Sequence, residues 1–213
     1  MNYFLTLKLL HVVAFVYWLG GDLGTFFSSR FVIDPALTPA QRATALKIML
    51  GCDQGPKLCM PLIFALGFTM AVQMSLITAP ALVTAAVWLV TLLWFANVNF
   101  LYFTHDAAAK ARLSQIDLWF RVAVVAGLAA AGVFVQPPWL AAKIWIFAAL
   151  VACGIYIRIN LKPFVAAFGQ LMTKGSSPEV ESALSGSIAR VRPAVYLIWL
   201  GLLANAALGL HLL

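Results

Sequence analysis

Long apolar runs alternate with short polar segments along the whole chain. Six of the runs reach the roughly 20 residues that a helix needs to cross a hydrocarbon core about 30 Å thick. The predicted spans are residues 3–28, 57–74, 82–102, 119–135, 139–159 and 194–213. This pattern predicts an all-α, polytopic integral membrane helix bundle, with residues 1–213 forming a single transmembrane domain.

The composition supports the same class of protein. Of the 213 residues, 63% are hydrophobic and 10% are charged, whereas about 25% of the residues of an average soluble domain are charged. The mean hydropathy is +0.96. The sequence has no P-loop and no HExxH or GxSxG motif, which argues against an ATP-driven pump and against the common hydrolases.

The basic residues predict how the spans are oriented. Twelve of the fourteen lie between or beside alternate pairs of spans: Arg30, Arg42, Lys47, Lys57, Lys110, Arg112, Arg121, Arg158, Lys162, Lys174, Arg190 and Arg192. Because basic residues concentrate on the cytoplasmic side of membrane proteins, we expect both termini to lie outside. The net charge of +7 then reflects topology and attraction to anionic lipid, and not nucleic-acid binding.

Two of the cytoplasmic connections carry signals for a helix start. Thr38 precedes Pro39, and Ser177 precedes Pro178, which are the residue types favoured at the N-cap and the first helical position. We therefore predict two short interfacial helices at the cytoplasmic face of the membrane.

The first and last pairs of spans also resemble each other. The segment "FLTLKLLHVVAF" can be aligned with "WLAAKIWIFAAL", which places Lys8 over Lys143. Residues 1–75 and 137–213 can therefore be read as a distant parallel repeat about an axis along the membrane normal.

The first span contains ionisable side chains that lipid does not favour. His11, Trp18 and Asp22 are spaced by seven and four residues, and Lys8 precedes His11 by three, so we expect all four on one helical face. Because Lys or Asp in mid-span costs about 2.5–3.5 kcal/mol, that face should point into the bundle. One interpretation is that His11 and Asp22 only hydrogen-bond other helices, through Asn97, Asn99 or Asn205.

The other interpretation is a cofactor site. A neutral imidazole suits haem iron, and facing helices of a bundle commonly hold such a group. His11 would then ligate the iron of a haem b, and Lys8 and Lys143 would pair with its propionates, or Lys143 would act on the substrate. His211, near the outer end of the last span, is the candidate second ligand.

Sulfur-bearing side chains give a weaker signal for copper. The segment "KIMLGCDQGPKLCM" places Met49, Cys52, Cys59 and Met60 near the inner end of the second span. Soft sulfur ligands suit Cu(I), although methionine in an apolar helix usually serves packing.

The opening segment "KLLHVVAFVYWLGGDL" resembles the first helix of the CopD-like copper-resistance proteins and the HemJ-type protoporphyrinogen oxidases. The shared element is a basic residue, a histidine three residues later and a tryptophan seven residues after that, here Lys8, His11 and Trp18. Arg30 resembles the arginine that ends this helix in the HemJ type, and "AAKIWIF" resembles a later helix with an intramembrane lysine, here Lys143. The resemblance implies haem b bound through His11.

These observations predict a haem b protein of the bacterial inner membrane that transfers electrons or oxidises a lipid-soluble substrate, such as a quinol or porphyrinogen. The candidate catalytic residues are Lys143 and Asp22. The expected partners are membrane lipid, a quinone-like or other hydrophobic small molecule and further copies of the chain. Copper transport or resistance and a non-catalytic partner subunit remain the alternatives.

Overall fold

The computed structural model describes residues 3–212, and their regular structure is entirely helical. The helices are α1 (Tyr3–Val32), α2 (Pro39–Gln73), α3 (Ala81–Phe103), α4 (Ala107–Phe134), α5 (Pro138–Asn160), α6 (Lys162–Lys174) and α7 (Pro178–Gly209). With α5 and α6 taken as one segment, six helical segments are long and apolar enough to cross a membrane. The predicted class, an all-α bundle with six such segments, is confirmed.

Two of the long helices begin at the predicted caps. The Thr38 hydroxyl accepts a hydrogen bond from the Gln41 backbone at the start of α2, and the Ser177 hydroxyl accepts one from the Val180 backbone at the start of α7. Neither helix ends after a few turns, because α2 continues through Pro56 and Pro61 and α7 through Pro193. The segments predicted as short interfacial helices are therefore the first turns of α2 and α7, and the separate short helix is α6.

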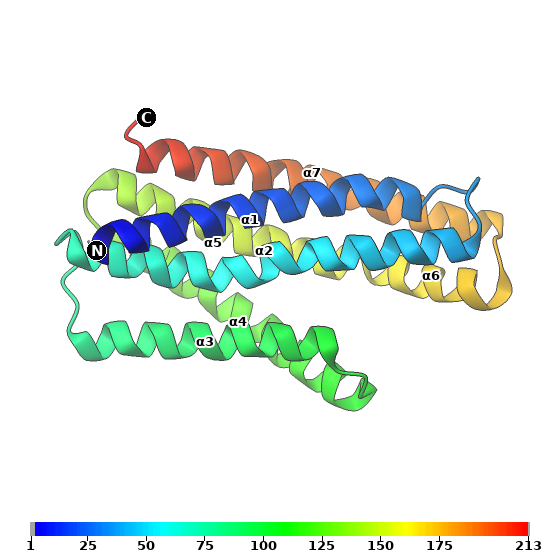
Figure 1. Ribbon diagram of the computed structural model, residues 1–213, viewed down its shortest axis with the longest axis horizontal. Coiled ribbons are helices and arrows are strands. Elements are labelled where there is room, and N and C mark those ends of the chain that lie inside the picture. The colour runs from blue at the N-terminus through cyan, green and yellow to red at the C-terminus, as the bar shows by residue number, and fades with distance from the viewer. Residues whose placement is uncertain (1–2, 213) are drawn as a thin grey trace.

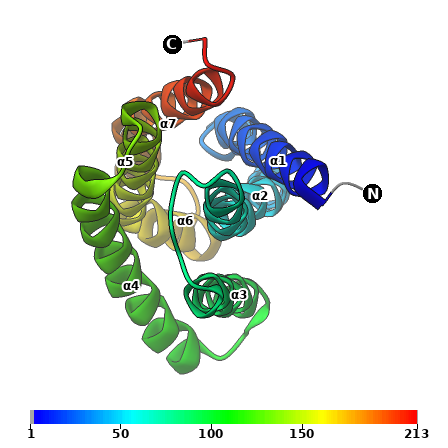
Figure 2. The same cartoon turned by 90° about the vertical axis from the view of Figure 1, so that its left-hand side faces the viewer.

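The helices pack as two groups that meet along the bundle axis. One group is α1, α2 and α3, and the other is α4, α5 and α7. The antiparallel helices α1 and α2 contact each other along most of their length, and α5 packs against both α4 and α7. Seen from the end, α3 stands beside α2 and α4 on one side of the bundle, and α7 closes the other side between α1 and α5 (Figure 2). The main apolar core lies between these groups and includes Ala14, Trp18, Ile63, Trp94 and Leu150.

Three helices extend beyond α3. The 23 residues of α3 span about 34 Å, close to the thickness of a membrane core, whereas the 30 to 35 residues of α1, α2 and α7 span about 45–52 Å. Their extra length gathers with α6 at one end of the molecule, past the turn between α3 and α4 (Figure 1). A second apolar core lies there, made by Val32, Met49, Phe164, Ala167, Phe168, Leu171, Val180, Leu184 and Ile188.

A buried arginine joins the helices of this extension. The Arg42 guanidinium binds both carboxylate oxygens of Glu181, at 2.7 and 3.0 Å, and its Nε donates to the Val32 carbonyl at 2.8 Å. The contact ties α2 to α7 and to the end of α1. A bidentate pair of this kind fixes orientation as well as distance, so the extension is a defined layer of four helices.

Candidate functional site

The inward face of α1 positions the candidate residues. Its buried residues are Leu7, Ala14, Trp18, Ser29 and Val32. They are separated by helical spacings, and His11 and Asp22 fall on the same stripe with buried polar atoms. Lys8, by contrast, is exposed. The prediction that Lys8 shares this face is wrong, because position 8 lies about 100° around the helix from the buried Leu7.

His11 packs against α2. A Cβ placed on Gly67 would lie 3.1 Å from Cε1 of the imidazole, so glycine lets the ring pack closely on α2 there. Nδ1 of His11 is buried and has no hydrogen-bond partner among residues 3–212. The imidazole also interacts with the backbone of Ile63 on α2, and its Nδ1 remains a buried nitrogen without a partner.

Lys143 lies on the other side of the bundle axis. Its ammonium donates a hydrogen bond of 2.6 Å to the backbone carbonyl of Asn205, which links α5 to α7. Its charge is near enough to act on His11. The structure thus brings His11 and Lys143 into one region, as the haem hypothesis requires.

The structure places two other predicted cofactor-binding residues elsewhere. His211 is exposed beyond the end of α7, with its ring edge-on to Trp139 at 5.0 Å. Arg30 is exposed, and its guanidinium lies over the rings of Phe26 and Phe27. Each contacts aromatic rings at a helix end, so neither side chain shares a contact with His11.

Trp18 serves the core. It is 1% exposed, and its ring meets Phe147 of α5 edge-on at 6.1 Å. Tryptophan at this position fills the space between α1 and α5, so its predicted role beside a cofactor has no support from its contacts.

Six buried side-chain atoms have no hydrogen-bond partner within the described part of the chain. They are His11 Nδ1, Asp22 Oδ2, Gln54 Oε1, Arg192 Nε, Trp199 Nε1 and Asn205 Oδ1. All of them belong to α1, α2 or α7. We call the buried surface that carries these six atoms the polar seam. The seam therefore follows the contacts that α1 makes with α2 and with α7, of which the contact with α7 is much the smaller.

A second group of charges, which the sequence did not predict, surrounds Asp117. The Asp117 carboxylate accepts hydrogen bonds from Trp94 Nε1 at 3.1 Å, Arg121 Nε at 2.8 Å and Arg158 at 2.9 Å. Arg158 also donates to Ser114. These residues come from α3, α4 and α5, so one buried carboxylate holds three helices together.

Arg121 has further neighbours in this group. Its guanidinium lies 5.2 Å from the centre of the Trp94 ring and donates to the sulfur of Met60 at 3.5 Å. The spacing of Asp117 and Arg121, four residues apart in an apolar run, was the available sequence signal. Their partners on α2, α3 and α5 carry no local signal, which is why the group was missed.

The predicted copper ligands are not brought together. Cys59 and Met60 are buried in the main core, Met49 lies in the core of the extension, and Cys52 faces Gly24 of α1. Cys52 and Cys59 are separated by about 10 Å along α2, too far to share one ion. Among residues 3–212, no group of three or more His, Cys, Asp or Glu side chains could hold a metal ion.

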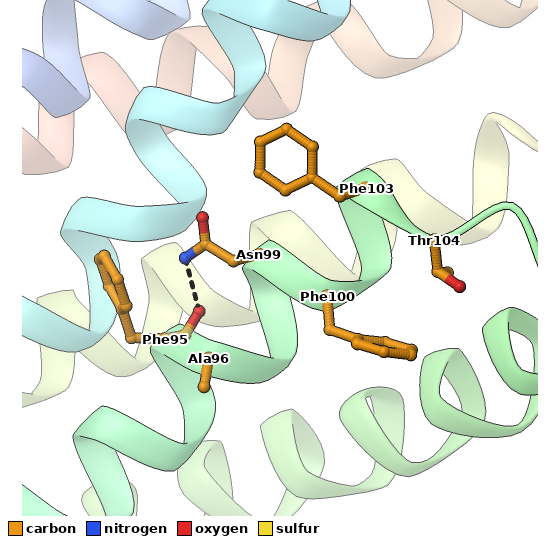
Figure 3. A pocket seen from close by; sticks show the side chains of 6 residues that line it. All are labelled: Phe95, Ala96, Asn99, Phe100, Phe103 and Thr104. Carbon is orange, nitrogen blue, oxygen red and sulfur yellow. Dashed lines mark hydrogen bonds between the residues drawn. The ribbon is translucent and has the colours of Figure 1, made fainter.

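The described surface hollows are apolar and lie away from His11. One, of about 600 Å³, lies along α3 and is lined by Phe95, Ala96, Asn99, Phe100, Phe103 and Thr104 (Figure 3). The Asn99 amide turns back to the Phe95 carbonyl of its own helix at 2.9 Å. This bond uses the amide nitrogen of the side chain that was a candidate partner for His11 or Asp22.

A second hollow, of about 500 Å³, lies over the glycine-rich contact between α1 and α2. Its lining residues are Val16, Tyr17, Gly20, Gly21, Gly51, Cys52 and Gly55. It is open and apolar, so it offers space without a polar group to orient a ligand.

Comparison with protein-family models, with curated proteins and with solved structures finds no match to this chain. A function must therefore be argued from the polar groups of the bundle and from the motifs of the first helix.

Proposed function

We propose that the protein binds haem b in the bacterial inner membrane and transfers electrons or oxidises a lipid-soluble substrate, such as a quinol or porphyrinogen. The observation that supports this most is the buried Nδ1 of His11, which has no partner in the described chain. A neutral imidazole nitrogen is a standard ligand of haem iron. A buried nitrogen without a hydrogen bond is costly unless something binds it.

The chain's own residues would have limited roles at this site. His11 would ligate the iron, and Lys143, whose charge acts on His11, would pair with a propionate. Bound haem would supply one-electron chemistry. Asp22 lies further along α1 on the same polar seam and would serve proton exchange instead of iron binding.

The histidines provide a direct test. We expect detergent-purified protein to show the Soret and α bands of haem b after dithionite reduction, and His11→Ala to lose them because the iron ligand is removed. His105→Ala and His211→Ala, which change exposed side chains, should keep the bands. A colourless wild-type protein, or a His11→Ala variant with its full haem content, would refute the proposal.

We also propose that both termini lie outside the cytoplasm, since the basic residues border the opposite ends of the helices. The four-helix extension would then lie on the cytoplasmic side. The exposed positions 78 and 107 lie at opposite ends of α3. In intact cells, a membrane-impermeant maleimide should label Thr78→Cys, but label Ala107→Cys only after permeabilisation. The unmodified chain gives the background from its native cysteines, and the reverse pattern would invert the topology.

A further inference from the structure

Two aspartates of the bundle, Asp22 and Asp117, differ in how they are satisfied. Asp117 accepts hydrogen bonds from Trp94, Arg121 and Arg158. Asp22 is half-buried and interacts with the Trp18 side chain one turn away, but its Oδ2 is buried without a hydrogen-bond partner in residues 3–212. A buried polar atom without a partner costs about 1–3 kcal/mol, and native proteins rarely leave one unsatisfied without an ordered water or ligand. Oδ2 of Asp22 therefore requires a hydrogen-bond partner from outside the described chain.

Three further unpartnered atoms lie on helices that meet beside Asp22. Gly21, the residue before it, packs directly on the Cys52 carbonyl and on Gly55 of α2, so Gln54 lies on the turn of α2 that faces Asp22. Phe26, one turn further along α1, contacts the Trp199 ring at 5.1 Å and lies 5.7 Å from the Arg192 guanidinium of α7. We call Asp22, Gln54, Arg192 and Trp199 the Asp22 junction.

The chemistry of these four atoms points to the type of partner. Asp22 Oδ2 and Gln54 Oε1 accept hydrogen bonds, whereas Trp199 Nε1 and Arg192 Nε can only donate them. A metal ion would be repelled by the two donors, and an anion would be repelled by the two acceptors. Water both donates and accepts, and buried water typically makes two to four hydrogen bonds to polar groups that otherwise have no partner.

We propose that ordered water fills the Asp22 junction and that Asp22 binds and releases a proton through it. The charged group that acts on the carboxyl is Asp53, which pairs with Lys57 on α2, while Arg192 of α7 and Arg30 of α1 both lie against Phe26, one turn further along α1. The negative charge of Asp53 acts on Asp22, and water can carry the proton that Asp22 exchanges. This inference does not depend on haem and holds for the apoprotein.

Asp117 serves as the matched control for a chemical test of the carboxyl group. A hydrophobic carbodiimide adds to a protonated carboxyl to give an O-acylisourea, which rearranges to a stable N-acylurea; one molecule of reagent is added and nothing leaves. In native membranes treated with N,N′-dicyclohexylcarbodiimide, mass spectrometry should find the adduct on Asp22, decreasing as pH rises, and not on Asp117. Equal labelling of both residues, or no adduct on Asp22, would overturn the proposal.

The water is tested separately by hydroxyl-radical footprinting of the wild-type protein. Radicals formed from ordered water oxidise adjacent side chains, so Trp199 should be oxidised several-fold faster than Trp94, which is 6% exposed and donates to Asp117. Equal, slow oxidation of both tryptophans would exclude water from the junction. Both measurements use the unaltered chain, so neither depends on the folding of a variant, and absence of haem would leave their interpretation unchanged.

Discussion

Replacing Asp117 with Asn should lower the free energy of unfolding by about 3–5 kcal/mol, the usual cost of removing one partner of a buried ion pair. Asn keeps the shape of the side chain but leaves Arg121 and Arg158 without their shared carboxylate. Two positive charges would then face each other among α3, α4 and α5. Thermal or denaturant unfolding in detergent, followed by tryptophan fluorescence, would measure the loss.

Two further variants make this measurement specific. Glu179→Gln removes an exposed carboxylate in the first turn of α7 and should cost less than about 1 kcal/mol. Adding Arg121→Gln to Asp117→Asn removes one of the uncompensated charges and should recover part of the stability. If the Asp117 variant lost no more stability than the Glu179 variant, the charged group would not hold the helices together.

The local features of the fold could be predicted from the sequence. Each apolar run near 20 residues proved to be part of a long helix, and Thr38 and Ser177 cap the helices that they were expected to cap. Both signals act within a few residues of the chain, so neither depends on tertiary contacts. The spacing of His11, Trp18 and Asp22 likewise gave the inward face of α1.

The continuity of α2 could not be predicted in this way. The second span was expected to start at residue 57, after a separate helix, and Pro56 and Pro61 lack a backbone N–H and usually end or kink a helix. In the structure, α2 runs through both prolines while it packs along α1. Packing of this kind compensates for missing helical hydrogen bonds in membrane proteins, and it depends on the partner helix.

The charged group around Asp117 could not be predicted either, because it also depends on how the helices pack. Asp117 and Arg158 are 41 residues apart and come together only because α4 packs on α5. Lys8 shows the opposite error, because a residue that was expected on the inward face is exposed. A spacing of three residues from His11 is compatible with the edge of a helical face as well as with its centre. The width of the buried stripe is set by the neighbouring helices, which the sequence of α1 alone does not reveal.

The two halves of the bundle differ in how completely their buried polar groups are hydrogen-bonded. Around Asp117, the carboxylate and both guanidinium groups have partners, whereas the unpartnered buried atoms of the described chain all lie on the polar seam of α1, α2 and α7. Fully satisfied polar networks make a structure rigid. We therefore expect α3, α4 and α5 to form the fixed scaffold and the polar seam to carry the chemistry.

Replacing Gly21 with Ala should destabilise the protein by about 1–3 kcal/mol, the usual cost of overpacking. A Cβ at Gly21 would lie 2.7 Å from the Cys52 carbonyl oxygen and would also overlap the ring of Pro56. Both obstacles belong to the backbone or a proline ring of α2, so no side chain can turn away and the two helices must separate. The same unfolding measurement would detect the loss.

Gly20 provides a control one residue away. A Cβ there would have no heavy atom within 4 Å, and alanine is favoured over glycine in a helix interior by up to about 1 kcal/mol. Gly20→Ala should therefore leave the protein as stable as the wild type or more so, while Gly21→Ala weakens it. Equal effects of the two substitutions would mean that close contact between α1 and α2 at Cys52 and Pro56 does not position the inward face of α1, including Asp22.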